Sequence, residues 1–275
     1  MTNLDEKTVE GFGDEWHRFD QSSLSDADRA RIFADYFAIF PWDHLPDNAE
    51  GADIGCGSGR WALLVAPRVG YLHCVDPSTA LDVARNNLLA LKNVEFHRTS
   101  VEALPFPDGS LDFAYSLGVL HHVPDTAAAI RSVAAKLKPG APFLIYLYYA
   151  FDNRPTWFRM LWNFSNALRL VIARLPHSLR FAVSQILAAV IYWPLAKEAS
   201  MLENFNLLPV NWPLAYYRDK EFYVMRTDAL DRFGTRLEQR FTRAQIQRML
   251  ETAGFREIHF SDAQPYWCAL GIKGK

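Results

Sequence analysis

The chain has 275 residues, of which half are hydrophobic and 14% aromatic, so it can bury a sizeable core in one large domain with an insertion or a small second lobe. Its formal net charge of -2 does not favour nucleic acid as a partner, since nucleic-acid binding usually needs a basic face. The first residues contain no apolar signal region, and the three cysteines (Cys56, Cys74 and Cys268) lack the spacing of a metal site. We therefore expect a cytoplasmic protein without a bound metal.

Residues 1–47 are predicted to form an N-terminal helical cap. A helix is expected over residues 29–40, and Pro41 ends it because proline lacks a backbone N–H. A cluster of aromatic and charged side chains lies upstream and includes Trp16 and Arg18. This cluster either packs on the neighbouring domain or closes over a bound ligand.

A glycine-rich turn with the sequence DIGCGSG follows the first predicted strand, residues 49–52. Glycine has no Cβ, so the chain can turn sharply there and a ligand can lie against the backbone. A helix-compatible run, residues 60–69, points free N–H groups and a positive dipole end at that space. Asp76 ends the next apolar run, residues 71–75, where a carboxylate can accept two hydroxyl protons of a ribose. These features predict a nucleoside cofactor site.

The glycine spacing distinguishes between two classes of nucleoside cofactor. Dinucleotide sites read G-x-G-x-x-G and place a pyrophosphate at the helix end, whereas this turn reads G-x-G-x-G, which disfavours a nicotinamide-dependent oxidoreductase. Asp53 lies two residues before the first glycine, where a carboxylate would repel a pyrophosphate but suits a cationic amino-acid group. The turn resembles the first motif of the class I S-adenosylmethionine-dependent methyltransferases, D/E-x-G-x-G-x-G, in which an acid also closes the second strand.

Strand-like and helical segments alternate over residues 48–150, which predicts parallel strands with crossover helices. A third strand is expected at residues 93–100, a fourth at 111–116 and a fifth at 141–149. The order of these motifs resembles the methyltransferase subgroup that contains the ubiquinone and menaquinone biosynthesis enzymes. One departure is Ser100, which stands where that family usually has Asp.

Residues 151–240 interrupt this alternation with long apolar segments that contain arginine and tryptophan, and their spacing and length favour helices. The most apolar run, residues 181–195, is shorter than the roughly 20 residues of a membrane span. In the family that the chain resembles, this region usually builds a lid over the acceptor. The insertion could equally pack on its own domain, form a homodimer contact or rest peripherally on a membrane surface.

The sheet pattern returns in residues 241–275. Thr242 is a candidate N-cap for a helix over residues 243–253, and strands are expected at residues 255–260 and 266–272. In the family that the chain resembles, the last two strands form an antiparallel hairpin at the sheet edge. The resemblance therefore implies an α/β, Rossmann-like doubly wound sheet, mostly parallel, with strand order 3-2-1-4-5-7-6 and a helical insertion.

The resemblance also implies which residues bind the cofactor, S-adenosylmethionine. The glycine turn surrounds its methionine part, Asp76 holds its ribose, and the segments after the third and fourth strands line its adenine side. The alternative for Asp76 is a simple turn-forming role. The cofactor-binding residues expected on this basis are Asp53, Gly55, Cys56, Gly57, Gly59, Asp76, Ser100, Val101, Glu102, Ser116 and Leu117.

His121 and His122 follow the fourth strand and are the candidate catalytic residues. Ligands of a doubly wound sheet bind beyond the C-terminal strand ends, and histidine can take a proton near neutral pH. In some members of the family that the chain resembles, a histidine at the place of His121 takes part in catalysis. The alternative is that one or both histidines cap the following helix or pack locally.

Five residues near the end of the fifth strand are candidates for binding the methyl acceptor: Tyr148, Tyr149, Asp152, Asn153 and Arg154. Their hydroxyl, amide and charged groups suit an acceptor with hydroxyls or a carboxylate, and arginine offers a bidentate fork. The alternative is an ordinary loop with a structural ion pair.

The predicted function is methyl transfer from S-adenosylmethionine to an oxygen or nitrogen atom of a small or medium-sized metabolite. Two alternatives remain open: a lipid or quinone-like acceptor at a membrane surface, and a non-catalytic S-adenosylmethionine-binding subunit that partners another protein. Base methylation of nucleic acid is disfavoured because the Asn/Asp-Pro-Pro-Tyr motif of amino-methylating relatives is replaced by Ser116-Leu117-Gly118-Val119.

Overall fold

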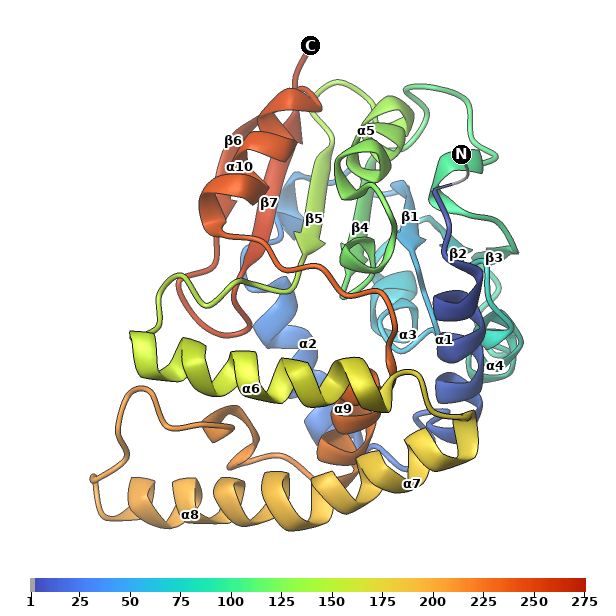
Figure 1. Cartoon of the computed structure of the whole chain (residues 1–275). Helices are drawn as coiled ribbons and strands as arrows, with labels where there is room; N and C mark the ends of the chain where they lie inside the picture. Colours follow the sequence, from blue (N-terminus) through green and yellow to red (C-terminus); the bar gives the residue numbers. More distant parts are fainter. Residues whose placement is uncertain (1–2) are drawn as a thin grey trace. The chain divides into compact units, whose positions relative to one another are not determined.

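Seven strands form one sheet in the order β3-β2-β1-β4-β5-β7-β6 (Figure 1). The computed structural model describes residues 3–275 of the chain. Strands β1 to β5 run parallel, and β7 pairs antiparallel with both β5 and β6. This arrangement confirms the predicted doubly wound sheet. The strands are β1 (Glu50–Ile54), β2 (Tyr71–Val75), β3 (Val94–His97), β4 (Phe113–Leu117), β5 (Pro142–Tyr146), β6 (Phe255–Phe260) and β7 (Cys268–Lys273).

The chain divides into two units, each with its own set of internal contacts. The first contains the sheet and comprises residues 3–20, 29–150 and 237–275, and the second comprises residues 21–28 and 151–236. Most of the predicted N-terminal cap therefore belongs to the sheet unit. Residues 237–240, which were assigned to the insertion, also belong to the sheet unit.

Helices cover the sheet of the first unit on both faces, so its central strands are apolar throughout. Strand β4 is buried at every residue, as expected of a strand covered on two sides. On one face Ile130 and Leu250, from two different helices, join the main hydrophobic core. On the other face Phe37 packs edge-on against Tyr115 of β4 at 5.2 Å between ring centroids.

The helices of the first unit are α1 (Glu6–Arg18), α3 (Ala62–Val65), α4 (Ala80–Asn87), α5 (Thr126–Lys136) and α10 (Arg243–Thr252), while α2 (Asp26–Phe37) begins among residues of the second unit. Thr242 caps α10 as predicted, in a capping box with Gln245 that satisfies two N-terminal backbone groups. Asp125 caps α5 by accepting a hydrogen bond from the backbone N–H of Ala128.

Five of the seven strands have ends that differ from the prediction, and the third strand, expected over residues 93–100, is only Val94–His97. The first strand was expected over residues 49–52, but pairing of Asp53 and Ile54 with β2 extends it. The fifth strand was expected to reach residue 149, but regular pairing stops at Tyr146, because its partner β4 ends opposite that residue at Leu117. Strands β4 and β5 therefore end opposite each other, at their C-terminal ends.

The second unit is helical, as predicted. Its elements are α6 (Thr156–Ile172), α7 (His177–Leu187), the π-helical turn η5 (Ala188–Tyr192), α8 (Trp193–Asn204), the 3-10 turn η6 (Ala215–Tyr217) and α9 (Phe222–Gly234). Its small core is formed where η5 and α8 meet α9, with Tyr192, Met225 and Phe233 among the buried side chains. The π-helical turn η5 lies just before Pro194. Proline has no backbone N–H, so Pro194 cannot donate the hydrogen bond of a regular α-helix.

Helices α7 and α8 are continuous through η5, and the resulting helix is longer than the apolar run that the sequence suggested. It spans His177–Asn204, 28 residues, and by length and composition it is apolar enough to cross a membrane. Only 28% of the most apolar 18-residue stretch of this helix is buried. Much of this apolar surface is therefore exposed.

Candidate functional site

The glycine turn links β1 to α3 and has a backbone that only glycine adopts easily. Gly55, Gly57 and Gly59 all have positive φ values, of +80°, +53° and +76°. A Cβ on Gly55 would lie 2.3 Å from a methyl carbon of Val119, and one on Gly57 would lie 2.9 Å from Nε1 of Trp16. The glycines therefore allow both the positive φ values of the turn and the close packing of Val119 and Trp16 against its main chain.

Asp53 is the last but one residue of β1 and is almost completely buried. Its Oδ2 accepts a hydrogen bond from the Tyr115 hydroxyl at 3.0 Å, but its Oδ1 has no partner among the described residues. Burial raises the pKa of this carboxyl to about 8, with the Tyr115 hydrogen bond opposing the rise. A cationic group beside Oδ1 would satisfy the unpaired oxygen and restore the charged form.

Asp76 follows β2 and organises the turn opposite Asp53. Its Oδ2 accepts from the backbone N–H of Gly57 at 3.0 Å, and its Oδ1 accepts from the N–H and the hydroxyl of Ser78 at 2.8 and 2.6 Å. Asp76 therefore stabilises the turn, as the alternative interpretation of this residue expected. A carboxylate has about four lone-pair sites, so one remains for a ribose hydroxyl.

Helix α1 brings Trp16 onto the glycine turn. Its indole lies against Gly57, and the guanidinium of Arg60 lies 5.4 Å from the centre of its ring. Arg18 instead pairs with Asp14 on the same helix at 2.9 Å. Of the two N-terminal residues singled out from the sequence, Trp16 is the one that lies at the turn.

The residues expected near adenine lie in different surroundings. Val101 is buried in the main hydrophobic core, whereas Glu102 is exposed and accepts a hydrogen bond from the backbone N–H of Asn3 at 2.7 Å. Ser100 begins the 3-10 turn η3 (Val101–Ala103) and is half-buried. The Glu102 carboxylate thus anchors the N-terminal segment.

The remaining cofactor candidates, Ser116, Leu117 and Cys56, are buried in or beside the glycine turn and β4. Ser116 is buried in β4 and donates its hydroxyl hydrogen to the Ile54 carbonyl at 2.8 Å, which joins two strand ends. Leu117, the last residue of β4, is also buried. Burial raises the pKa of the Cys56 thiol well above its ordinary value, so this side chain is neutral and apolar in character.

His121 and His122 lie in the 3-10 turn η4 (Leu120–His122), just beyond β4. Their rings are 3.9 Å apart, and the ring of Tyr148 stacks on His121 at 3.8 Å. His121 is fully buried, and neither of its ring nitrogens has a partner among the described residues. Burial lowers its pKa well below 6.5, helped by His122 and Arg240, so the ring is neutral at pH 7.

His122 has a structural role that the sequence left open. Its Nδ1 is 2.7 Å from the Leu237 carbonyl, and its ring packs on Phe12 of α1 at 4.8 Å. The backbone N–H of Gln239 donates to the His121 carbonyl at 3.0 Å. The histidine pair is therefore held by α1 and by the segment over residues 237–241.

The two tyrosines near the end of β5 point in different directions, as neighbouring residues of an extended chain do. Tyr148 stacks on His121 and has the guanidinium of Arg240 4.9 Å from its ring centre. Tyr149 instead packs against the main core near Tyr266, with ring centroids 5.7 Å apart. The structure thus brings Tyr148 to the histidines, whereas Tyr149 packs half-buried against the core.

Asp152, Asn153 and Arg154 belong to the second unit. The Arg154 guanidinium donates to the Val210 carbonyl at 3.1 Å and to Oδ1 of Asn211 at 2.8 Å. It therefore ties the start of the insertion to a later loop of the same unit. Asp152 and Asn153 are exposed.

Sequence reasoning missed several residues that complete the site. Tyr115 holds Asp53, and Arg240 and Gln239 come from a segment that was assigned to the insertion. Tyr115 is directly opposite Asp53 in the parallel register of β1 and β4, so a predicted register for these two strands would have indicated it. No local pattern indicates that residues 237–241 return to η4, because that contact spans more than a hundred residues.

Residues 52–145 match the methyltransferase domain family. The uncharacterized methyltransferase YcgJ of Bacillus subtilis is 35% identical over 101 residues, which are 36% of this chain and 40% of that protein. A ubiquinone biosynthesis O-methyltransferase of Marinobacter nauticus is 35% identical over 98 residues, which are 34% of this chain and 41% of that protein. The chain spans about two fifths of the length of these curated relatives.

Solved structures agree on the fold. An S-adenosylmethionine-dependent methyltransferase of Thermotoga maritima matches 96% of this chain and 100% of its own, with a TM-score of 0.52 and 14% identity, which shows the shared fold alone. The buried Oδ1 of Asp53, which has no partner among the described residues, also fits a cofactor with a cationic amino-acid end. Residues 52–145 therefore form a methyltransferase domain, and S-adenosylmethionine is the cofactor that this match implies for the domain.

Proposed function

We propose that the chain transfers a methyl group from S-adenosylmethionine to an oxygen or nitrogen atom of a small or medium-sized metabolite in the cytoplasm. The observation that carries the acceptor half of this proposal is His121, a buried neutral imidazole without a partner for either ring nitrogen among the described residues. A buried polar atom that lacks a hydrogen bond costs free energy, so a ligand that supplies one gains affinity. Hydroxyl and amine groups can supply it.

Asp53, Asp76 and the glycine turn are the groups proposed to hold the cofactor. When bound, S-adenosylmethionine supplies an electrophilic methyl group on a sulfonium centre. Oδ1 of Asp53 is the acceptor for a cationic amino-acid group, and Asp76 retains one lone-pair site for a ribose hydroxyl. Positioning of this kind supplies much of the rate in an in-line displacement.

His121 is proposed to accept the proton that leaves the acceptor as the acceptor is methylated. Its pKa lies well below 6.5, so the base form is present throughout the neutral range. Stacking on Tyr148 fixes the plane of the ring. We therefore expect no loss of rate from protonation of His121 between about pH 6 and pH 8, which a rate–pH profile at saturating substrate would show.

The test uses labelled S-adenosylmethionine, small-molecule extracts of the host and mass analysis of the product. His121→Asn should lower kcat by about 100-fold or more while leaving the affinity for S-adenosylhomocysteine unchanged. Asp53→Asn should weaken S-adenosylhomocysteine binding instead. Tight NADH binding in place of S-adenosylhomocysteine would contradict the cofactor half of the proposal.

Two further outcomes address the acceptor. Full transfer activity in His121→Asn would exclude the proton-accepting role. A protein that binds S-adenosylhomocysteine but methylates nothing in any metabolite pool would favour the non-catalytic subunit. Methylation of added RNA would overturn the expectation that nucleic acid is not a partner.

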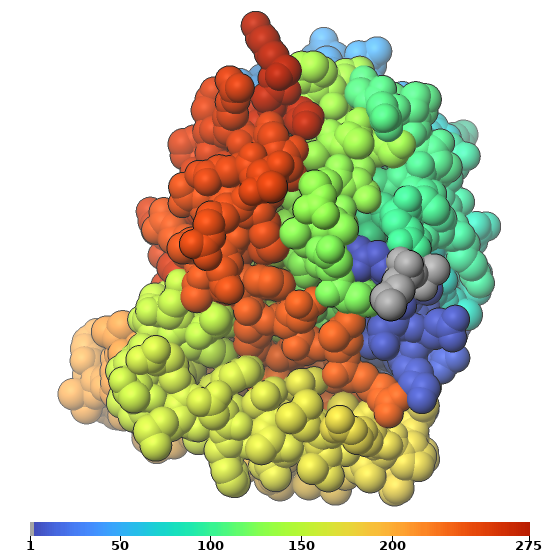
Figure 2. Space-filling view, turned by 45° about the horizontal axis from the view of Figure 1, so that its top comes forward, coloured from blue at the N-terminus to red at the C-terminus, as the bar shows by residue number. Residues whose placement is uncertain are grey.

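A second candidate is methyl transfer to a lipid or quinone-like acceptor, with the second unit resting on a membrane surface. Helix α6, in yellow-green to yellow in Figure 2, contributes to the molecular surface. It exposes a row of apolar side chains at helical spacing, namely Trp157, Met160, Leu161, Phe164, Leu168 and Val171. The continuous helix of α7 and α8 exposes Leu179, Ile186, Val190 and Trp193. Exposed apolar areas of this extent usually mark an interaction site.

The charges on these helices favour an anionic surface. Residues 156–195 contain four arginines and no aspartate or glutamate. Arg159 and Arg174 are exposed, so they are available to lipid headgroups next to the apolar rows. Amphipathic helices with this combination bind in the plane of an anionic membrane.

Vesicle sedimentation tests this second candidate. The wild-type chain should bind vesicles that contain phosphatidylglycerol more tightly than neutral vesicles, and Trp157→Ser with Phe164→Ser should weaken that binding by tenfold or more. Leu89→Ser, at an exposed leucine of the first unit, is the matched control and should bind normally. No vesicle binding by the wild type would contradict the candidate, and a dimer that the double variant dissociates would assign the row to a homodimer contact.

A further inference from the structure

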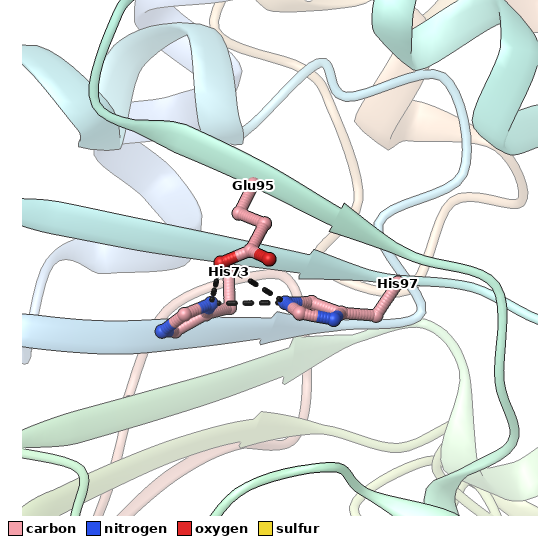
Figure 3. Close-up of side chains that lie close together, drawn as sticks. All are labelled: His73, Glu95 and His97. Atoms are coloured by element: carbon pink, nitrogen blue, oxygen red, sulfur yellow. Dashed lines mark hydrogen bonds and ion pairs between the residues drawn. The ribbon is translucent and has the colours of Figure 1, made fainter.

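Two histidines and a glutamate meet on one face of the sheet, outside the set of side chains proposed for methyl transfer. His73 lies in β2, and Glu95 and His97 lie in β3 (Figure 3). His73 is directly opposite Glu95 in the parallel register, and His97, two residues further along, lies on the same face. No metal site was expected from the sequence, because these residues come from two strands and form no local motif.

The three side chains can each turn one ligand atom toward a common point. Nδ1 of His73 and Nε2 of His97 are 3.0 Å apart, and Oε2 of Glu95 lies 3.6 and 3.8 Å from them. A point equidistant from these three atoms lies about 2.0 Å from each, which matches zinc–nitrogen and zinc–oxygen bond lengths.

A second carboxylate orients His73 in the way that metal-binding histidines usually require. Nε2 of His73 is 2.9 Å from Oε1 of Glu50, at the start of β1. When Nε2–H donates to this carboxylate, the lone pair of the ring lies on Nδ1, which faces His97. Carboxylate–histidine–metal arrangements fix the tautomer and strengthen the ligand in this manner.

Packing further restricts the two rings, whereas the glutamate remains accessible. Phe106 lies 4.7 Å from the His73 ring and 5.3 Å from the His97 ring, between centroids. The side chain of His73 is 8% exposed and that of His97 17%, but that of Glu95 is 52% exposed. An ion can therefore reach the histidines from the side of Glu95, where water can fill a fourth position.

We propose that His73, Glu95 and His97 bind one divalent transition-metal ion, with Zn²⁺ as the expected occupant. Strand β3 is at the sheet edge and pairs only with β2, so the ion would join the edge strand to its single neighbour. Through Glu50 the link extends to β1. Two imidazoles and one carboxylate are a donor set that suits Zn²⁺, and Cu²⁺ would bind the same ligands by its general affinity order.

The metal-free arrangement is a hydrogen bond between the two histidine rings. One ring donates to the other across the 3.0 Å between Nδ1 and Nε2, and no ion is needed for this contact. The two states differ in what the glutamate does. Only the metal site requires Oε2 of Glu95, so Glu95→Gln distinguishes them.

The test is titration of the metal-free full chain with Zn²⁺ by calorimetry and with Co²⁺ by visible absorption, in which a tetrahedral site gives strong d–d bands. One saturable site is expected in the wild type. His97→Ala and Glu95→Gln should abolish it or weaken it by at least 100-fold, and Glu50→Gln should weaken it by about 10- to 100-fold. His44→Ala, at an exposed histidine, is the control and should leave it unchanged.

Folding is checked independently, because a variant of a sheet residue could fail to fold. Each variant should keep its circular dichroism spectrum and its affinity for S-adenosylhomocysteine, which also separates failure of this site from failure of the cofactor site. Zn²⁺ should raise the melting temperature of the wild type and not that of Glu95→Gln. No saturable binding in the wild type, or equal binding in the wild type and in folded Glu95→Gln and His97→Ala, would overturn the proposal.

Discussion

At the scale of single residues, Asp53 shows how a buried carboxyl makes the folded protein less stable at neutral pH. Its carboxyl has a pKa of about 8 in the folded chain, against about 3.9 when unfolded, because burial disfavours the charged form. Between these two pH values the folded chain holds more protons than the unfolded chain. The contribution of Asp53 to stability is therefore present below about pH 4 and is lost as the pH rises to about 8.

Asp53→Asn should remove this pH dependence. The free energy of unfolding of the variant, minus that of the wild type, should increase with pH by at most about 1.4 kcal/mol per pH unit and level off above about pH 8. Urea denaturation at pH 5, 6, 7 and 8 measures it. Asp108→Asn, at an exposed carboxylate, should show no such trend. Parallel curves for wild type and Asp53→Asn would show that Asp53 ionises normally in the folded chain.

At the scale of elements, the C-terminus of α9 depends on two buried arginines. Nη1 of Arg180 donates to the Gly234 carbonyl at 2.8 Å, and Nη1 of Arg169 donates to the Thr235 carbonyl at 2.8 Å. Cations at a helix C-terminus satisfy its unpaired carbonyls and complement its dipole. These contacts join α6 and α7 to the end of α9 within the second unit.

Arg180→Ala should destabilise the second unit by about 2–4 kcal/mol, because it leaves a buried helix end without a donor. Arg159→Ala, at an exposed site of α6, should change the free energy of unfolding by less than about 0.5 kcal/mol. Denaturation followed by tryptophan fluorescence compares the two. An equal, small effect for both variants would mean that water satisfies the Gly234 carbonyl.

The elements also show what the sequence could predict and why. The prediction for residues 71–75 is confirmed, because an apolar run bounded by turn residues defines a buried strand locally. The prediction for residues 255–260 is also confirmed, although this strand at the sheet edge is exposed at half of its residues. The glycine turn, Asp53 and Asp76 were likewise predicted from a local pattern, and their role in binding the cofactor stays a prediction. The return of residues 237–241 to His121, the inward packing of Tyr149 and the meeting of His73 with His97 depend on contacts between distant segments, so no local pattern could indicate them.

At the scale of the whole molecule, each unit has a hydrophobic core of its own, and the proposed cofactor groups all belong to the first unit. A ligand that binds only the folded state stabilises it by RT ln(1 + [L]/Kd), which is about 2.7 kcal/mol at 100 times Kd. We therefore expect S-adenosylhomocysteine to raise the melting transition of the first unit selectively. Calorimetry of the full chain should show two transitions, of which only one shifts.

The origin of that shift can be tested with Asp53→Asn. The variant should be at least as stable as the wild type without ligand at pH 8, since it lacks the buried carboxylate, yet it should gain little from S-adenosylhomocysteine. NADH at the same concentration should shift neither transition. A ligand-induced shift of both transitions by the same amount would show that the two units unfold together, and an undiminished shift in Asp53→Asn would mean that the cofactor does not depend on this carboxylate.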